Sequence, residues 1–180
     1  ILVNYFSVSL GIALSLKLKK QFGVVWVITG DGAIEEGAFY EAVLIASSLK
    51  LPIIFVVENN KWSLGTSISE RRTEIDLFKF VDSMNVGFQS LKDNNINDYL
   101  STMLKIREIV AATTQPQVLE VEVHSLGGFY VAEDQDSKRY VNYHAGAIKI
   151  EPDENGIFEK ISTDPVFTSL KYSKKIIFDC

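Results

Sequence analysis

The spacing of apolar residues divides the first part of the chain into helical and extended segments. Residues 9–20 carry leucines four positions apart and end in a lysine cluster before Gly23, which predicts a helix that stops there. Residues 24–29, "VVWVIT", are short, β-branched and bounded by glycines. This run predicts a strand that is buried on both faces.

The next two segments continue this alternation. Residues 35–50 have acidic side chains in the first turn, Pro52 just after the last turn, and one apolar helical face made of Ala38, Ala42, Ile45, Ala46 and Leu49. Residues 52–57, "PIIFVV", predict a second buried strand. A strand, a helix and a strand in this order predict a right-handed crossover, with the carboxyl ends of two parallel strands at one edge of a sheet.

The remaining chain extends this pattern. Asn95 begins a further helical segment, and residues 117–123 predict another strand. The fold class we predict is therefore α/β, a doubly wound parallel sheet, in a single domain over residues 1–180. Residues 146–180 form a C-terminal extension of uncertain structure, with turn residues and mixed patterning, in which "KKIIFDC" is either a final strand or the edge of a truncation. The apolar start without methionine leads us to expect that the domain lacks its N-terminal part.

Composition narrows the class of protein. The chain is 47% hydrophobic and 23% charged, with a net charge of −5, as expected for one soluble globular domain. The acidic balance argues against a nucleic-acid partner, and we expect the adjacent Arg71 and Arg72 to be solvated loop charges. No run approaches the ~18 apolar residues of a membrane helix, and no signal-peptide pattern opens the chain.

Cysteine and histidine usage limits the metal chemistry. Cys180 is the sole cysteine, so no intrachain disulfide can form, which favours a cytoplasmic location. His124 and His144 have no neighbour at the spacing of zinc ligands. We therefore expect a cytoplasmic protein without a zinc site.

Polar clusters follow the first two predicted strands. Asp31 stands between two glycines after the first strand, and Asn59 and Asn60 follow the second. Carboxylate and amide oxygens suit Mg²⁺, which takes one or two protein side chains and completes its shell with phosphates and water. Glycine also lets a diphosphate approach the backbone closely. Each cluster on its own is more often part of a turn than of a binding site. Two such clusters at neighbouring strand ends predict a site for Mg²⁺ and a diphosphate.

Acidic residues at the start of the next predicted helix oppose the binding of an anion. Glu35 and Glu36 suit a helix N-terminus but repel an anion held there. A phosphate bound at this edge therefore needs a cation to bridge it.

The two clusters carry a resemblance. "GDG" at residues 30–32 and "NN" at residues 59–60 look like the opening and close of the thiamine-diphosphate-binding motif. The intervening "EGAFYEAVLIASSLKLPIIFVVENN" and the following "KWSLGTS" are similar to the alpha subunits of 2-oxo acid dehydrogenases of the pyruvate, branched-chain and acetoin type. The resemblance covers most of residues 8–125 and implies the diphosphate-binding domain of the thiamine-diphosphate-binding fold.

The resemblance also implies site residues. Mg²⁺ would be held by the side chains of Asp31 and Asn60 and by the backbone carbonyl of Trp62. Thiamine diphosphate would be held by the same loops, with backbone N–H groups of Gly32 and Ala33 facing the diphosphate. The implied cofactor-binding set is Gly30, Asp31, Gly32, Ala33, Asn60 and Trp62.

One segment departs from the family pattern. After the strand at residues 117–123 the family usually has an arginine and one or two histidines, whereas this chain has "HSLGGFYVAEDQDSKRY". The arginine position falls at Ser125, and a channel histidine falls near residues 127–129. The catalytic residues are therefore unknown, with His124 a weak candidate, and the change bears on turnover more than on cofactor binding.

The implied function is oxidative decarboxylation of a 2-oxo acid, with acyl transfer to a lipoyl group. Expected partners are a beta-type subunit, which supplies the glutamate that activates the cofactor, and a lipoyl-bearing acyltransferase, in a heterotetrameric dehydrogenase component. Two alternatives stay open: a transketolase-like N-terminal subunit, because "GDGAIEEGAFYEA" also echoes that family, and a non-catalytic paralogue that keeps the metal site.

Overall fold

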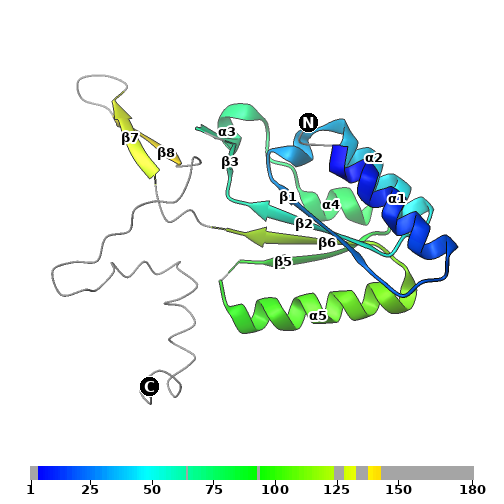
Figure 1. The fold of residues 1–180 in the computed structure, drawn as a ribbon. Coiled ribbons are helices and arrows are strands. Elements are labelled where there is room, and N and C mark those ends of the chain that lie inside the picture. The colour runs from blue at the N-terminus through cyan, green and yellow to red at the C-terminus, as the bar shows by residue number, and fades with distance from the viewer. Residues whose placement is uncertain (1–3, 64, 93, 124–127, 133–137, 143–180) are drawn as a thin grey trace, which may run out of the picture.

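A central parallel sheet organises the chain in the computed structural model, which describes residues 4–63, 65–92, 94–123, 128–132 and 138–142. Its four strands run in the order β1-β2-β6-β5, all parallel (Figure 1). The helical elements are α1 (Asn4–Leu18), the 3₁₀ turn η1 (Ala33–Glu35), α2 (Gly37–Ser48), α3 (Ile68–Arg71), α4 (Leu77–Asp82) and α5 (Ile96–Thr113). The strands are β1 (Val25–Gly30), β2 (Ile53–Asn59), β3 (Trp62–Ser63), β4 (Thr66–Ser67), β5 (Gly87–Leu91), β6 (Gln117–Glu122), β7 (Gly128–Ala132) and β8 (Lys138–Asn142).

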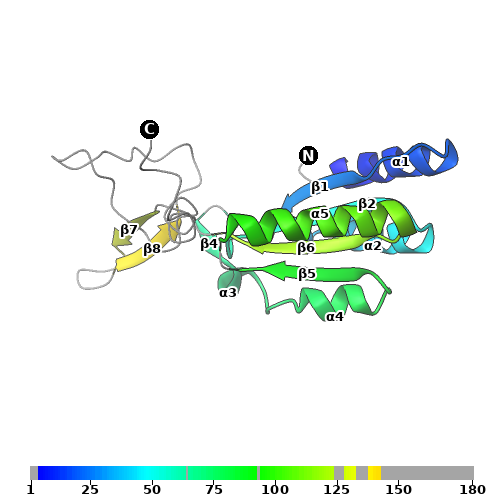
Figure 2. The ribbon, with the colours of Figure 1, turned by 90° about the horizontal axis from the view of Figure 1, so that it is seen from below.

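Helices cover both faces of the sheet, as the doubly wound prediction requires. The α1, α2 and α4 side holds a cluster that includes Phe6, Phe39 and Phe55, whose ring centroids lie 5.6–6.4 Å apart. On the opposite face α5 packs Ile106 and Val110 onto the sheet, and Figure 2 shows this helix lying along the strands. The predicted α/β fold class is confirmed.

The connections explain the strand order. β1 passes to β2 through α2, and β2 passes to β5 through α3 and α4, with α2 and α4 on one face. β5 then returns through α5 on the other face, and β6 enters between β2 and β5. A reversal of direction along the sheet needs a change of face if every crossover is right-handed, which is the geometry that a right-twisted sheet favours.

The two apolar strands differ in burial. β2 has neighbours on both sides, and its first five residues are all buried, which confirms the prediction for residues 52–57. The same prediction for β1 is wrong, because Ile28 is 63% exposed. β1 stands at the edge of the sheet. The α5 cluster covers Ile54 and Val56 of the neighbouring strand β2 but does not include Ile28 of β1.

The helix predicted at residues 35–50 exists, but it is shorter and buries a different face from the one predicted. It begins at Gly37 after the separate turn η1 and ends at Ser48. Ala42 and Ala46 are buried as predicted, whereas Ile45 and Leu49 are exposed. Their predicted places are taken by Phe39 and Val43, because the aromatic cluster beneath the helix draws in the larger ring of Phe39.

Several elements have weak signals in the sequence. β5 reads "GFQSL", with two exposed residues among five, and β3 and β4 are two residues each. Residues 146–180 lie outside the described residues, so the predicted extension stays a prediction. Within the part of the chain that the structure describes, no helix is long and apolar enough to cross a bilayer.

Candidate functional site at the carboxyl edge of the sheet

The register of β1 and β2 brings the two polar clusters to one edge of the sheet. Gly30 pairs with Glu58, and the Asp31 N–H donates to the Glu58 carbonyl at 3.2 Å. Asp31 therefore leaves the sheet beside Asn59, with Asn60 one residue further on. The predicted proximity of the two clusters follows directly from this ladder.

Asp31 is a buried carboxylate with a buried partner. The residue is 2% exposed, and its Oδ2 accepts a hydrogen bond from Arg71 Nη2 at 2.7 Å. Burial raises the pKa of the Asp31 carboxyl above its ordinary value, while the hydrogen bond and charge of Arg71 act to lower it. An acid kept in the interior at this energetic cost is typical of a functional position.

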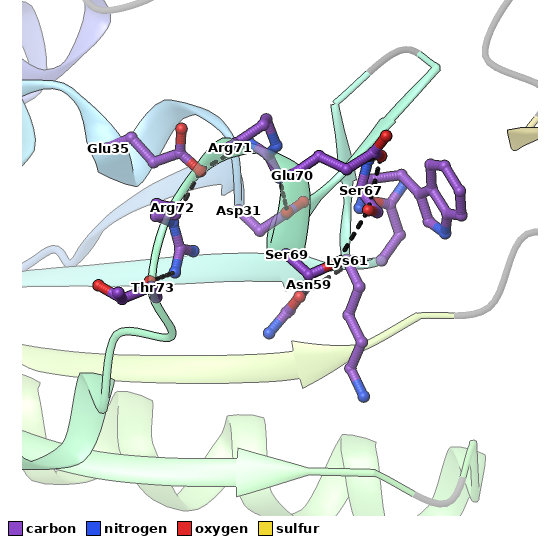
Figure 3. A network of polar contacts seen from close by, with 12 residues as sticks. Asp31, Glu35, Asn59, Lys61, Ser67, Ser69, Glu70, Arg71, Arg72 and Thr73 are labelled. Atoms are coloured by element: carbon purple, nitrogen blue, oxygen red, sulfur yellow. Dashed lines mark hydrogen bonds and ion pairs between the residues drawn. The ribbon is translucent and has the colours of Figure 1, made fainter.

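Arg71 connects Asp31 to Glu35 of the η1 turn, and Arg72 binds Glu35 as well (Figure 3). Arg71 Nη1 donates to Glu35 Oε1 at 2.6 Å, and Arg72 Nε donates to the same oxygen at 2.7 Å. Arg72 Nη1 also donates to the carbonyl of Thr73 at 3.1 Å. The expectation that both arginines are solvated loop charges is wrong, because their side chains are only 12% and 15% exposed.

The two asparagines have different roles. Asn59 Nδ2 donates to Glu120 Oε1 at 2.8 Å, and its Oδ1 accepts from the Lys61 N–H at 3.1 Å, so this side chain ties β2 to β6. Asn60 Oδ1 accepts a hydrogen bond from the Trp62 N–H at 2.9 Å. Because an amide oxygen has two lone pairs, Asn60 Oδ1 can accept a hydrogen bond and still coordinate a cation.

A strap, defined as residues 60–63 and 65–73, folds over the loop that carries Asp31. It contains the β3–β4 ladder and α3, whose first turn is fixed by a capping box between Ser67 and Glu70. A Cβ placed on Gly32 would lie 3.0 Å from Ser63 Oγ and 3.2 Å from Arg71 Nη1. A side chain at position 32 would therefore crowd Ser63 and Arg71 of the strap, whereas the φ of −72° at Gly32 is open to any residue.

A cleft of about 1300 Å³ opens beside the strap. Its apolar side includes Phe78 and Phe88, whose ring centroids are 5.8 Å apart. Its polar side carries acidic and basic groups from the strap and from the ends of β5 and β6, including Arg71, Arg72, Lys92, Glu120 and Glu122. The arginine network thus forms part of the wall of a cleft at the carboxyl edge of the sheet, where open α/β sheets bind ligands.

The donor set at this edge fits Mg²⁺. Asp31 and Asn60 offer hard oxygen ligands, which Mg²⁺ prefers. Among the described residues, no group of three or more histidine, cysteine, aspartate or glutamate side chains is placed to hold a metal. Two side-chain oxygens are a number that Mg²⁺ commonly takes from a protein, with phosphate oxygens and water completing its shell.

Sequence reasoning missed the arginines. Arg71 lies 40 residues after Asp31, and its chemistry depends on a strap with little apolar patterning. A signal was present in Asp31 and Glu35, two nearby acids that need compensating cations, and in the adjacent arginines after the capping box. His124 lies outside the described residues, so its candidacy stays a prediction.

Comparison with known proteins adds an independent result. Residues 2–128 match the sequence model of a family described as "Dehydrogenase E1 component". The chain is 31% identical over 124 residues to the pyruvate dehydrogenase E1 component subunit alpha of Rickettsia typhi, a match that covers 68% of this chain and 38% of that protein.

Two further relatives show the breadth of the likeness. The protein of the same description from Staphylococcus epidermidis is 31% identical over 163 residues, or 90% of this chain and 40% of the relative. The mitochondrial 2-oxoisovalerate dehydrogenase subunit alpha 1 of Arabidopsis thaliana is 26% identical over 150 residues, or 76% of this chain and 31% of the relative. The chain spans about two fifths of the length of the Rickettsia typhi and Staphylococcus epidermidis relatives.

Proposed function

Because the chain belongs to the dehydrogenase E1 component family, as an alpha-subunit sequence of the 2-oxo acid dehydrogenase type, we propose that it binds Mg²⁺ and thiamine diphosphate for the oxidative decarboxylation of a 2-oxo acid. The observation that carries the proposal is the joint position of Asp31 and the Asn59–Asn60 pair at one sheet edge, set by the pairing of Gly30 with Glu58. This edge is also where the cleft opens.

Each proposed ligand has a stated task. The side chains of Asp31 and Asn60 and the backbone carbonyl of Trp62 would hold Mg²⁺. Backbone N–H groups of Gly32 and Ala33 would face the diphosphate, with Gly30 ending β1 so that the loop can turn. These residues bind and orient, since their oxygens and N–H groups neutralise and position phosphate charge rather than react.

The reactive chemistry belongs to the cofactor. Bound thiamine diphosphate would supply the carbanion that removes carbon dioxide from a 2-oxo acid. The proposal includes a beta-type subunit that contributes the activating glutamate, a lipoyl-bearing acyltransferase as acyl acceptor, and a cytoplasmic location. These partners are proposed from the family to which the chain belongs.

Calorimetry tests cofactor binding. The chain is co-expressed with a beta-type subunit and titrated with thiamine diphosphate, with and without Mg²⁺. We expect binding that needs Mg²⁺ and is lost in Asp31→Ala, whereas Asp82→Ala, an exposed acid at the end of α4, binds as the parent does.

Two results would contradict the proposal. The first is no heat of binding in the parent complex, and the second is parental affinity in Asp31→Ala. Transfer between sugar phosphates without a lipoyl acceptor would instead favour the transketolase-like alternative.

A further inference from the structure

Arg71 holds together both acids of the candidate cofactor loop. Its guanidinium donates to Asp31 at 2.7 Å and to Glu35 at 2.6 Å. The Asp31 and Arg71 side chains are 3% and 12% exposed, so this contact is shielded from water. An arginine in such a place binds strongly, because its planar fork matches carboxylate oxygens and its charge is permanent.

The formal charges of the cluster cancel. Asp31 and Glu35 supply two negative charges, and Arg71 and Arg72 supply two positive ones. Mg²⁺ alone would add two positive charges to a neutral, partly buried cluster and would meet a carboxylate already paired. A metal accompanied by a diphosphate brings its own negative charge, so the two together enter at a lower electrostatic cost.

We propose, resting on the function proposed above, that Arg71 is an exchangeable counter-cation: it pairs with Asp31 in the absence of Mg²⁺, and when the metal takes Asp31, the freed guanidinium pairs with the diphosphate. Arg71 is then both a competitor of the bare metal and a ligand of the metal–diphosphate pair.

The contacts of Arg71 favour this exchange. Glu35 retains the Nη1 side of the guanidinium, and Arg72 binds the same Glu35 oxygen, so the strap stays anchored when Asp31 is withdrawn. Arg71 Nη1 also lies 3.2 Å from the Cβ position of Gly32, which puts the guanidinium against the loop proposed to hold the phosphate. The distance to be covered is therefore short.

The guanidinium also has unused donor capacity. Arg71 Nε is buried and has no hydrogen-bond partner among the described residues. Leaving a buried donor unpaired costs free energy, which a phosphate oxygen would recover. Release of Nη2 from Asp31 would add a second donor, and arginine binds phosphate best through two donors.

The exchange predicts opposite effects of one substitution on two ligands. Arg71→Ala removes the competitor for Asp31, so the bare metal should bind roughly tenfold tighter, equivalent to the loss of one opposing charged hydrogen bond. The same change removes a ligand of the diphosphate, so thiamine diphosphate at saturating Mg²⁺ should bind roughly tenfold more weakly.

The experiment measures both affinities in the complex of the chain with a beta-type subunit. Mn²⁺, read by its electron paramagnetic resonance signal, probes the bare metal, and calorimetry at saturating Mg²⁺ probes thiamine diphosphate. Arg107→Ala, which removes an exposed arginine of α5, is the matched control and should change neither affinity. Arg71→Lys keeps the charge and the fold but loses the fork, so it should still weaken thiamine diphosphate binding.

The two arms also separate this inference from the proposed function. A parent complex that binds no thiamine diphosphate would overturn the proposed function and the exchange with it. A parent that binds the cofactor, beside Arg71→Ala and Arg71→Lys variants with unchanged affinities, or with both affinities weakened, would overturn the exchange alone. Opposite shifts in Arg71→Ala support it.

Discussion

At the scale of the residue, the unusual group is the Asp31 carboxyl. Its burial against the strap raises its pKa, and Arg71 offsets only part of that cost. A carboxylate whose charged form is disfavoured by burial is poorly suited to holding the fold together. It is well suited to accepting a cation that arrives later, because Mg²⁺ would recover the cost of its charge.

This imbalance predicts a pH dependence of stability. The pKa of Asp31 is raised above the ordinary value of 3.8, so the folded chain binds a proton there more readily than the unfolded chain. The contribution of Asp31 to the free energy of unfolding is therefore largest below that ordinary value and falls as pH rises through the raised pKa. Urea unfolding of the parent and Asp31→Asn between about pH 3.5 and 7 measures the difference.

We expect the parent to lose stability relative to Asp31→Asn as pH rises through that window. A constant difference would contradict the prediction. A parent that gains relative stability would show that pairing with Arg71 outweighs burial.

At the scale of the element, α5 depends on its first residues. Asn95 caps the helix: its Oδ1 accepts from the Asn97 N–H at 3.1 Å, and its Nδ2 donates to Asp98 Oδ2 at 2.7 Å. Asn95→Ala should lower the free energy of unfolding by about 1 kcal/mol, since loss of the cap would leave the Asn97 N–H without its side-chain acceptor. Thermal or urea unfolding followed by circular dichroism measures the change.

The same turn supplies the control. Asn97→Ala removes an exposed side chain and keeps the backbone N–H that the cap receives, so its stability should equal that of the parent or exceed it slightly. Equal losses in both variants would show that the Asn95 side chain does not act as a cap.

Which elements the sequence predicts depends on how each one is stabilised. β2 and α5 have strong local signals, a continuous apolar run and a capped helical pattern, and both are found. β1 has the same kind of run as β2, yet its exposed Ile28 reflects its position at the sheet edge, which is set by topology. β5 is stabilised by pairing with β6 more than by its own apolar residues, so the sequence "GFQSL" does not by itself predict a strand.

The candidate site divides in the same way. Asp31 and Asn60 can be identified from sequence because they directly follow apolar strands, and strand ends fix where side chains emerge. Arg71 and Glu35 could not, because their contact spans 36 residues and depends on how the strap folds. Long-range ion pairs leave no periodic signal along a chain.

At the scale of the whole molecule, the sheet joins two apolar clusters. Phe39 anchors one, with ring contacts to Phe6 and Phe55, and Ile106 anchors the other. Phe39→Ala should destabilise the protein by about 3–5 kcal/mol, the usual cost of removing a fully buried ring. Because β2 contributes to both clusters, the loss should lower a single cooperative transition.

Coincidence of two probes measures that cooperativity. Tryptophan fluorescence reports on Trp26 of the α5 side when Trp62 of the strap is replaced by phenylalanine in parent and variant alike. Far-ultraviolet circular dichroism reports on the helices of both sides. Separate midpoints in Phe39→Ala would show that the two faces unfold independently. Ile106→Val removes one methylene from the opposite face and should shift the same transition by a smaller amount, about 0.5–1.5 kcal/mol.

The insertion of β6 between β2 and β5 sets an order in time. β1 and β2 can pair as soon as residue 59 has left the ribosome, but β5 meets no strand of this sheet until residues 117–122 exist. During that interval α5 is made before the surface it covers is complete. The strap, synthesised between the two events, can close its arginines onto Asp31 while half of the sheet is still missing. The buried ion pair between Asp31 and Arg71 can thus form early in biosynthesis, before the sheet beside it is complete.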